Sequence, residues 1–126
     1  MKKILLLLFI LTLNSCEVRE NKFQVLEYQE YKNNVINKNV QLFDVRTPEE
    51  YSLGNIKGSK NIDFKNQEKF NIFFSELDKK TPVYLYCRSG NRSKKSADIL
   101  MDMGFSEIYD LKGGFIEWNL NKLKEN

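Results

Sequence analysis

The sequence predicts an α/β protein of three layers, in which helices cover both faces of a central, mostly parallel sheet of about five strands. Two observations lead to this fold class. Segments of strand character and helix character alternate from Phe23 onwards, and the strand segments are nearly continuous in apolar residues. Such runs are typical of strands that are covered on both faces. Because a helix-length segment separates successive strands, we expect the strands to run parallel.

The amino-terminal part of this fold is expected to be a strand and a helix within residues 23–36. The residues that would share one face of that helix are Tyr28, Tyr31 and Val35. The next strand is expected over residues 40–45, which are rich in β-forming side chains. A helix should follow at a capping box, because Thr47 can cap its first turn and Glu50 lies three residues later. We expect this helix to end near Gly54.

The remaining elements alternate in the same way. They are, in order, a strand over residues 60–63, a helix over residues 67–77, a strand over residues 83–86, a helix over residues 93–103, a strand over residues 107–111 and a last helix after the Gly113-Gly114 turn. In sheets of this kind, ligands bind beyond the carboxyl ends of the strands. Cys87 falls at such an end, directly after the strand at residues 83–86.

The first fifteen residues do not belong to this fold. Two lysines precede a continuous apolar run over residues 4–13, a pattern typical of a secretory signal peptide and too short to span a bilayer comfortably. The segment Leu13-Asn14-Ser15-Cys16 resembles a bacterial lipobox, which implies cleavage before Cys16 and lipidation of that cysteine. An ordinary cleaved signal or an uncleaved anchor is the alternative. The expected divisions are a signal peptide over residues 1–15, the lipidated Cys16 with a short tether over residues 16–22, and a folded domain over residues 23–126.

Lipidation would hold the domain on a membrane of the bacterial cell envelope, at its periplasmic or outer face. Two or three acyl chains anchor a protein stably, whereas one chain alone is marginal. Cleavage would also remove the two lysines of the signal peptide, so the formal net charge would fall from +3 to +1. A nearly neutral domain has no extended positive field, so we expect no nucleic-acid partner. The sequence leaves the oligomeric state open.

Cys87 is followed by small and polar residues, which argues against an inert buried thiol. Once Cys16 carries lipid, Cys87 is the remaining thiol of an exported protein, and no intramolecular disulfide can form. The chain contains no histidine, so we expect neither a metal site nor a cofactor. Cys87 is therefore predicted to be a reactive nucleophile.

The loop after Cys87 has the composition of an anion-binding cradle. Its residues are Arg88, Ser89, Gly90, Asn91, Arg92 and Ser93. Small residues allow successive backbone N–H groups to point inward, and a helix that begins near Ser93 adds its partial positive charge. Two arginines add full charges. Each of these effects favours the thiolate of Cys87 over its thiol.

The segment from Cys87 to Ser93 resembles the active-site loop of the rhodanese-like sulfurtransferases, Cys-x-x-Gly-x-Arg-Ser. The stretches from Phe43 to Ile62 and from Tyr109 to Asn119 resemble the upstream and the carboxyl-terminal signatures of the same family. The resemblance extends over about Phe23 to Leu123, essentially the whole expected domain. One departure is Asn55, which stands where the family usually has a histidine. We take that histidine to be chiefly structural, since an asparagine can also cap a turn.

The resemblance implies a rhodanese-like fold and sulfur transfer in two displacements. The Cys87 thiolate would take the outer sulfur of a donor such as thiosulfate or polysulfide as a persulfide, and would then pass it to cyanide or a thiol. Arg88 is the candidate for binding the anionic donor. Arg92 is expected to brace the loop through a carboxylate such as Asp44. The alternative for Asp44 is a structural ion pair with Arg46, and this pairing is favoured over a direct role in catalysis.

Two other functions use a similar cysteine. Cysteine phosphatases have a Cys-x5-Arg loop, but here only four residues separate Cys87 from Arg92, one too few to seat a phosphate comfortably. A membrane-tethered persulfide carrier or a thiol redox sensor, neither of which turns over, stays open, because an accessible thiolate is readily oxidised.

Overall fold

The computed structural model describes residues 20–126. The signal peptide, Cys16 and most of the tether lie outside the described residues, so export, lipidation and membrane attachment stay predictions of the sequence. The first strand, β1 (Lys22–Leu26), begins at the last residue that was assigned to the tether. Within residues 20–126, no helix has both the length and the apolar character needed to cross a bilayer.

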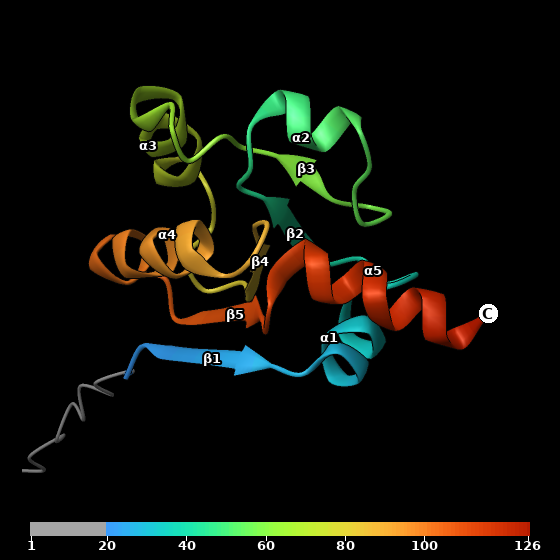
Figure 1. Cartoon of the computed structure of the whole chain (residues 1–126). Helices are drawn as coiled ribbons and strands as arrows, with labels where there is room; N and C mark the ends of the chain where they lie inside the picture. The colour runs from blue at the N-terminus through green and yellow to red at the C-terminus, as the bar shows by residue number, and fades with distance from the viewer. Residues whose placement is uncertain (1–19) are drawn as a thin grey trace, which may run out of the picture.

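A five-stranded sheet forms the centre of the domain, with the strand order β1-β5-β4-β2-β3 (Figure 1). The strands after β1 are β2 (Gln41–Asp44), β3 (Lys60–Asn61), β4 (Val83–Tyr86) and β5 (Glu107–Leu111). Each pair of neighbouring strands runs parallel. The predicted α/β class and its parallel sheet of five strands are therefore confirmed.

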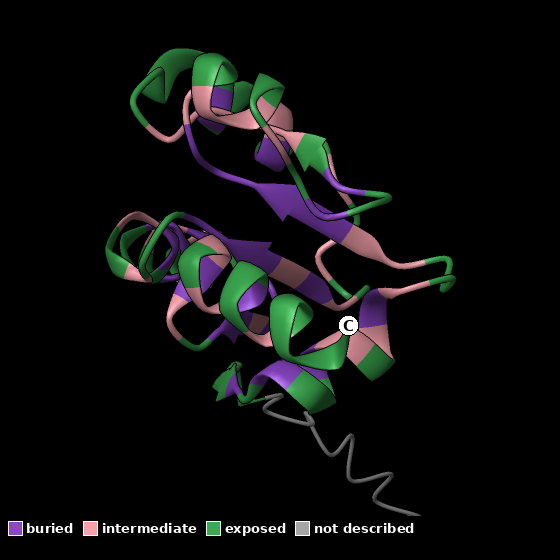
Figure 2. Ribbon diagram, turned by 45° about the vertical axis from the view of Figure 1, so that its right-hand side comes forward, coloured by how far each residue is buried: buried purple, intermediate pink, exposed green. Residues whose placement is uncertain are grey.

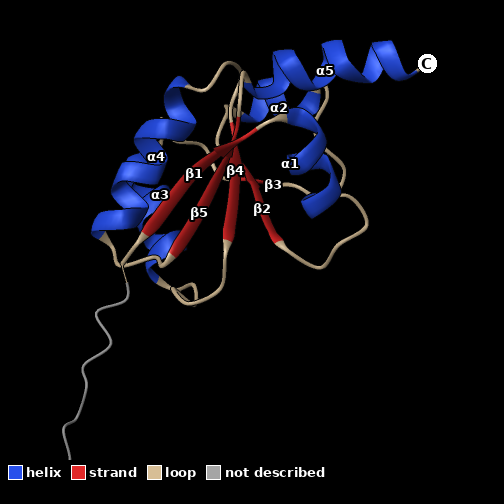
Figure 3. Ribbon diagram, turned by 90° about the horizontal axis from the view of Figure 1, so that it is seen from below, coloured by secondary structure: helices blue, strands red, loops and turns tan. Residues whose placement is uncertain are grey.

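Helices cover both faces of the sheet, as Figure 3 shows. The helices α3 (Gln67–Ser75) and α4 (Asn91–Asp102) pack on one face, and α1 (Tyr28–Val35) and α5 (Gly114–Glu125) pack on the other. The short α2 (Pro48–Ser52) connects β2 to β3. The three predicted layers are present.

Each face of the sheet has its own apolar core. Figure 2 colours the central strands between the helices mostly as buried. The core under α3 and α4 includes Phe43, Phe70, Phe74, Leu85, Cys87 and Ile108. The core under α1 and α5 includes Tyr31, Tyr86, Leu111 and Trp118. Burial of one large apolar side chain contributes about 1.5 to 3 kcal/mol, so both cores hold the sheet and its helices in a fixed arrangement.

The helix starts near the site follow from local sequence signals. At α2, the Thr47 hydroxyl accepts a hydrogen bond from the Glu50 N–H at 3.3 Å, and the Glu50 carboxylate accepts one from the Thr47 N–H at 3.0 Å. The predicted capping box is thus confirmed. The helix α4 begins at Asn91, two residues before its predicted start, because Gly90 adopts a φ of 105° and turns the chain directly into the helix.

Candidate active site

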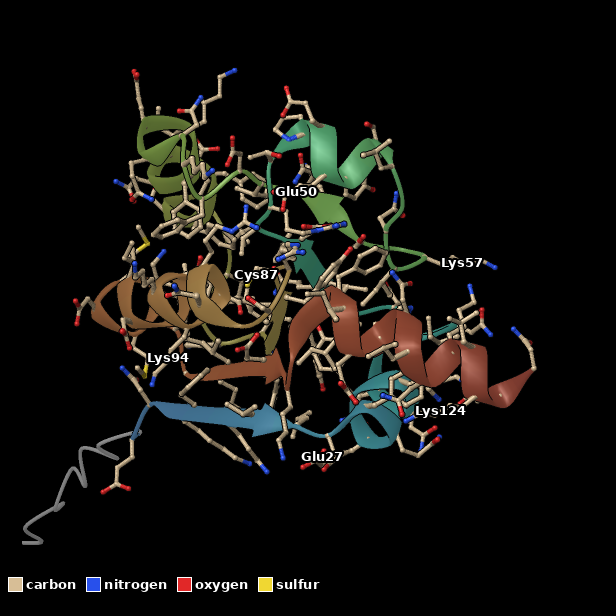
Figure 4. The ribbon with its side chains drawn as sticks, viewed as in Figure 1. Glu27, Glu50, Lys57, Cys87, Lys94 and Lys124 are labelled. Carbon is tan, nitrogen blue, oxygen red and sulfur yellow. The ribbon has the colours of Figure 1, made fainter. Side chains whose placement is uncertain are left out.

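Cys87 lies immediately after β4, at the carboxyl edge of the sheet and at the start of the loop into α4 (Figure 4). Its Sγ accepts a hydrogen bond from the Gly90 N–H at 3.1 Å and lies 3.3 Å from the Ser93 Oγ. The residue is only 1% exposed. The expectation that Cys87 is not buried was therefore wrong. The side chains of Arg88, Ser89 and Asn91 are exposed, whereas the Gly90 backbone and the Ser93 side chain lie against the sulfur.

The loop presents the Gly90 N–H to this sulfur, next to the amino terminus of α4. The left-handed conformation of Gly90 directs its N–H at the Sγ. The first N–H groups of a helix have no intrahelical partners and lie at the positive end of the helix dipole, and α4 begins within this loop. Of the predicted cradle residues, Arg88, Ser89 and Asn91 are exposed and Ser93 is buried. The arrangement suits an anionic sulfur, either a thiolate or a persulfide.

Arg92 braces the loop, but its partner is not the one that the sequence suggested. Its guanidinium donates to both carboxylate oxygens of Glu50, at 2.6 Å and 2.8 Å. Asp44 is instead held by Arg46, so the suggested Asp44 contact was wrong. The Glu50 side chain comes from α2, and Figure 4 shows it on the same side of the molecule as Cys87. The capping box thus positions the carboxylate that fixes the loop.

This contact gives Glu50→Gln a measurable cost. The Arg92 guanidinium holds the pKa of the Glu50 carboxyl at about 2, below its usual 4.5. Because the pKa is lowered in the folded state, the stabilisation is present above pH 4.5 and is lost as the pH falls towards 2. We expect Glu50→Gln to lower the free energy of unfolding by about 1 to 2 kcal/mol at pH 7 and to reduce the loss of stability in acid. Urea unfolding at several pH values measures both effects.

The matched control for that variant is Glu49→Gln, since Glu49 is the exposed neighbour in the same helical turn. Its substitution is expected to change the free energy of unfolding by less than about 0.5 kcal/mol. Equal costs for the two variants would show that the ion pair with Arg92 does not stabilise the loop.

The amino terminus of α5 supports the loop from the other side. The Phe115 N–H donates to the Cys87 carbonyl oxygen at 2.8 Å, and the Ile116 N–H donates to the Arg88 carbonyl oxygen at 3.1 Å. Gly114 has a φ of 62° and packs directly on this backbone. The sequence predicted the turn at Gly113-Gly114 but not its contact with the active-site loop. The paired glycines before a helix are a signal for close backbone packing. The segment on which they pack, at Cys87 and Arg88, is distant in the sequence and could not be inferred from it.

Asp44 and Arg46 form a buried ion pair at the end of β2. The Arg46 guanidinium donates to the Asp44 carboxylate at 2.6 Å and to the Gly54 carbonyl oxygen at 2.7 Å. It also lies over the Phe115 ring, 4.2 Å from the ring centroid. The expected structural pair is thus present. Because the Phe115 N–H also donates to the Cys87 carbonyl oxygen, the pair is linked to the active-site loop through α5.

Asn55, the departure from the family signature, is exposed and lies just beyond α2. Its Nδ2 donates to the Tyr51 carbonyl oxygen at 3.2 Å. The same carbonyl oxygen accepts the Gly54 N–H at 3.2 Å, so the asparagine adds a second hydrogen bond at the carboxyl end of the helix. The asparagine therefore caps the turn, as expected for a structural position.

These observations define a class of protein: a parallel α/β domain that carries a cysteine in an anion-binding loop at the carboxyl edge of its sheet. The family model described as the rhodanese-like domain matches residues 27–121. The chain belongs to the rhodanese-like family.

Similar proteins and solved structures agree with this assignment. The thiosulfate sulfurtransferase GlpE of Pseudomonas paraeruginosa is 40% identical over 78 residues, which cover 62% of this chain and 68% of GlpE. The YqhL protein of Bacillus subtilis is 41% identical over 81 residues, 64% of this chain, and the match spans only 62% of the length of YqhL. A crystal structure of a rhodanese-like domain protein from Staphylococcus aureus shares 29% identity and a TM-score of 0.65, covering 75% of this chain and 90% of that one.

Proposed function

We propose that this protein moves sulfane sulfur from a small anionic donor, such as thiosulfate or polysulfide, to a thiophilic acceptor through a persulfide on Cys87. One observation carries the proposal: the Cys87 Sγ accepts the Gly90 N–H at 3.1 Å, inside a loop that leads into the positive end of α4. Membership of the rhodanese-like family supports the same chemistry.

The first displacement forms an S–S bond and breaks one. The Cys87 thiolate attacks the outer sulfur of thiosulfate, and the electron pair of the broken S–S bond leaves on sulfite. Negative charge moves from Sγ to the terminal sulfur of the persulfide. In the second displacement, cyanide or a thiolate takes that terminal sulfur and the Cys87 thiolate returns. The cradle N–H groups stabilise the anion on either sulfur, as donors do in an oxyanion hole.

Arg88 is the candidate for attracting the donor. It is exposed beside Cys87, and within residues 20–126 its guanidinium forms no ion pair with a carboxylate. Arg46 and Arg92, by contrast, are held by carboxylates. A cation without a partner at the rim of the loop concentrates small anions near it. The burial of the sulfur favours a small donor over a bulky one.

The test is the intact mass of the full chain before and after incubation with thiosulfate. We expect a gain of one sulfur atom, about 32 Da, which peptide mapping assigns to Cys87 rather than Cys16. Cyanide should then remove the sulfur and release thiocyanate over repeated cycles. A stable gain of sulfur that neither cyanide nor thiols remove would indicate a persulfide carrier rather than an enzyme. No gain with thiosulfate or polysulfide would refute sulfur transfer and leave a redox sensor.

A further inference from the structure

A buried carboxyl group lies under the active-site loop, and the sulfur chemistry described above does not use it. Asp110 is a residue of β5 and is only 3% exposed. Its Oδ1 is fully buried, and within the described part of the chain that oxygen has no hydrogen-bond partner. An ionised carboxylate with one unpaired oxygen in such a place is costly, so its presence needs an explanation.

The sheet register places Asp110 on the Cys87 side of the sheet. Asp110 pairs with Leu85 of β4, and Cys87 follows two residues after Leu85. Side chains two residues apart along a strand share a face, so Leu85, Cys87 and Asp110 face the same helices. Ser93, in the first turn of α4, is fully buried over this face.

Ser93 lies between the carboxyl and the thiol. Its Oγ is 3.3 Å from the Cys87 Sγ, and either atom can be the donor. The Ser93 side chain also interacts with the Asp110 carboxyl, and this interaction lowers the pKa of the carboxyl, in part against the effect of burial. Burial nevertheless raises the pKa of Asp110 from its usual 3.8 to about 7. The carboxyl can therefore hold a proton near neutral pH.

Among residues 20–126, the groups around Asp110 do not supply a cation. On the opposite face of the sheet, the Tyr31 hydroxyl of α1 donates to the Leu85 carbonyl oxygen, and burial, followed by the nearby Asp110 charge, raises the pKa of Tyr31. Arg92 of α4 is held by Glu50. In β1, Val25 is the residue paired with Asp110. The other charged residues of α3, α4 and β1 are exposed: Lys22, Glu68, Lys69, Lys94, Lys95, Asp98 and Asp102.

We propose that Asp110 is a positioning residue that takes up the proton of Cys87 through Ser93, so that the three side chains share a single negative charge. This proposal rests on the proposed function for the role of Cys87 as the nucleophile. The thiol proton passes to the Ser93 Oγ while the Ser93 proton passes to the Asp110 carboxylate. One S–H bond breaks, one carboxylic O–H bond forms, and the total charge does not change. The neutral acid then donates to Ser93, and Ser93 donates to the thiolate.

Two anions in this buried space repel each other, so ionisation of one group opposes ionisation of the other. The proton therefore stays on Asp110 through both displacements, in which the sulfur remains anionic. The thiolate forms without release of a proton to solvent, from which the sulfur is shielded.

The rate of Cys87 alkylation by iodoacetamide, followed by peptide mass from about pH 4 to pH 10, tests this coupling. The wild-type protein is expected to show two steps in its pH profile, one for each proton of the pair. Asp110→Asn, which carries no titrating proton, is expected to show a single step. Ser93→Ala is expected to lower the rate at the first plateau roughly tenfold, since the thiolate loses a hydrogen bond. Circular dichroism establishes that each variant is folded.

A second measurement needs no change at Asp110. The carboxyl carbon of Asp110 is followed by NMR in the wild type and in Cys87→Ser. Without a thiolate to compete for the charge, the carboxyl is expected to ionise at a lower pH in Cys87→Ser. Two results would overturn the proposal. One is a pH profile of Asp110→Asn that keeps both steps, and the other is an Asp110 carboxyl that titrates at the same pH in Cys87→Ser as in the wild type. Neither measurement uses a sulfur donor, so the two proposals are tested separately. An absence of sulfur uptake would refute the proposed function, whereas the alkylation and NMR results alone decide the coupling between Asp110 and Cys87.

Discussion

Cys87→Ser is expected to abolish sulfur uptake from thiosulfate, with the rate falling at least about 1,000-fold. A serine hydroxyl is a weak nucleophile at neutral pH, whereas the thiolate is a strong one. The substitution keeps the shape of the side chain, and the serine oxygen can still accept the Gly90 N–H that now binds the sulfur. The fold should therefore survive. The intact mass after incubation with thiosulfate and the release of thiocyanate measure the loss.

The thermal midpoint provides the control for this variant. Cys87 is buried in the core under α3 and α4, so a serine there is expected to cost about 1 to 3 kcal/mol. That cost alone cannot account for a complete loss of sulfur uptake in a folded protein. Uptake by Cys87→Ser at the wild-type rate would show that sulfur binds elsewhere in the chain.

Gly114→Ala is expected to have the largest effect on stability, because it disrupts the contact between α5 and the active-site loop. A Cβ at this position would lie 2.6 Å from the Cys87 carbonyl oxygen and 2.6 Å from the Arg88 backbone. Its φ of 62° also costs an alanine about 1 to 2 kcal/mol, and overpacking adds about 1 to 3 kcal/mol. We expect the thermal midpoint to fall by roughly 10 °C or more. Sulfur uptake should slow at least about tenfold, since the cradle must shift.

Gly58→Ala separates backbone strain from the clash. Gly58 also has a positive φ, 88°, but no atom lies within 4 Å of the position that a Cβ would take there. Its substitution is expected to cost only the strain, about 1 to 2 kcal/mol, and to leave sulfur uptake unchanged. Equal losses of stability in the two variants, with normal uptake in Gly114→Ala, would contradict the role assigned to α5.

Local signals in the sequence were sufficient for the fold and for the position of the loop. The capping box at Thr47 and Glu50 fixes the start of α2 through contacts between residues three apart. Likewise, the strand before Cys87 can be recognised from its own apolar residues, without knowing which strands pair with it. Such features depend on residues that are close in the sequence, and a single sequence contains them.

Contacts between segments that are distant in the sequence could not be predicted from the sequence. Arg92 could have met any nearby carboxylate, and its pairing with Glu50 depends on how α2 packs beside α4. The burial of Cys87 likewise depends on the path of the loop backbone, which the polar side chains of the loop concealed. In the sequence, Asp110 was one polar residue in a strand. Only the register between β4 and β5 places it under the loop.

The position of β1 separates the point at which the chain enters the domain from Cys87. All strands of the sheet run parallel, so Lys22 enters at the amino edge while Cys87 lies at the carboxyl edge. A strand of this length spans roughly 15 Å, and the chain therefore enters the domain on the side away from the sulfur. A small molecule that approaches Cys87 therefore meets the edge of the sheet opposite to the one at which the chain enters.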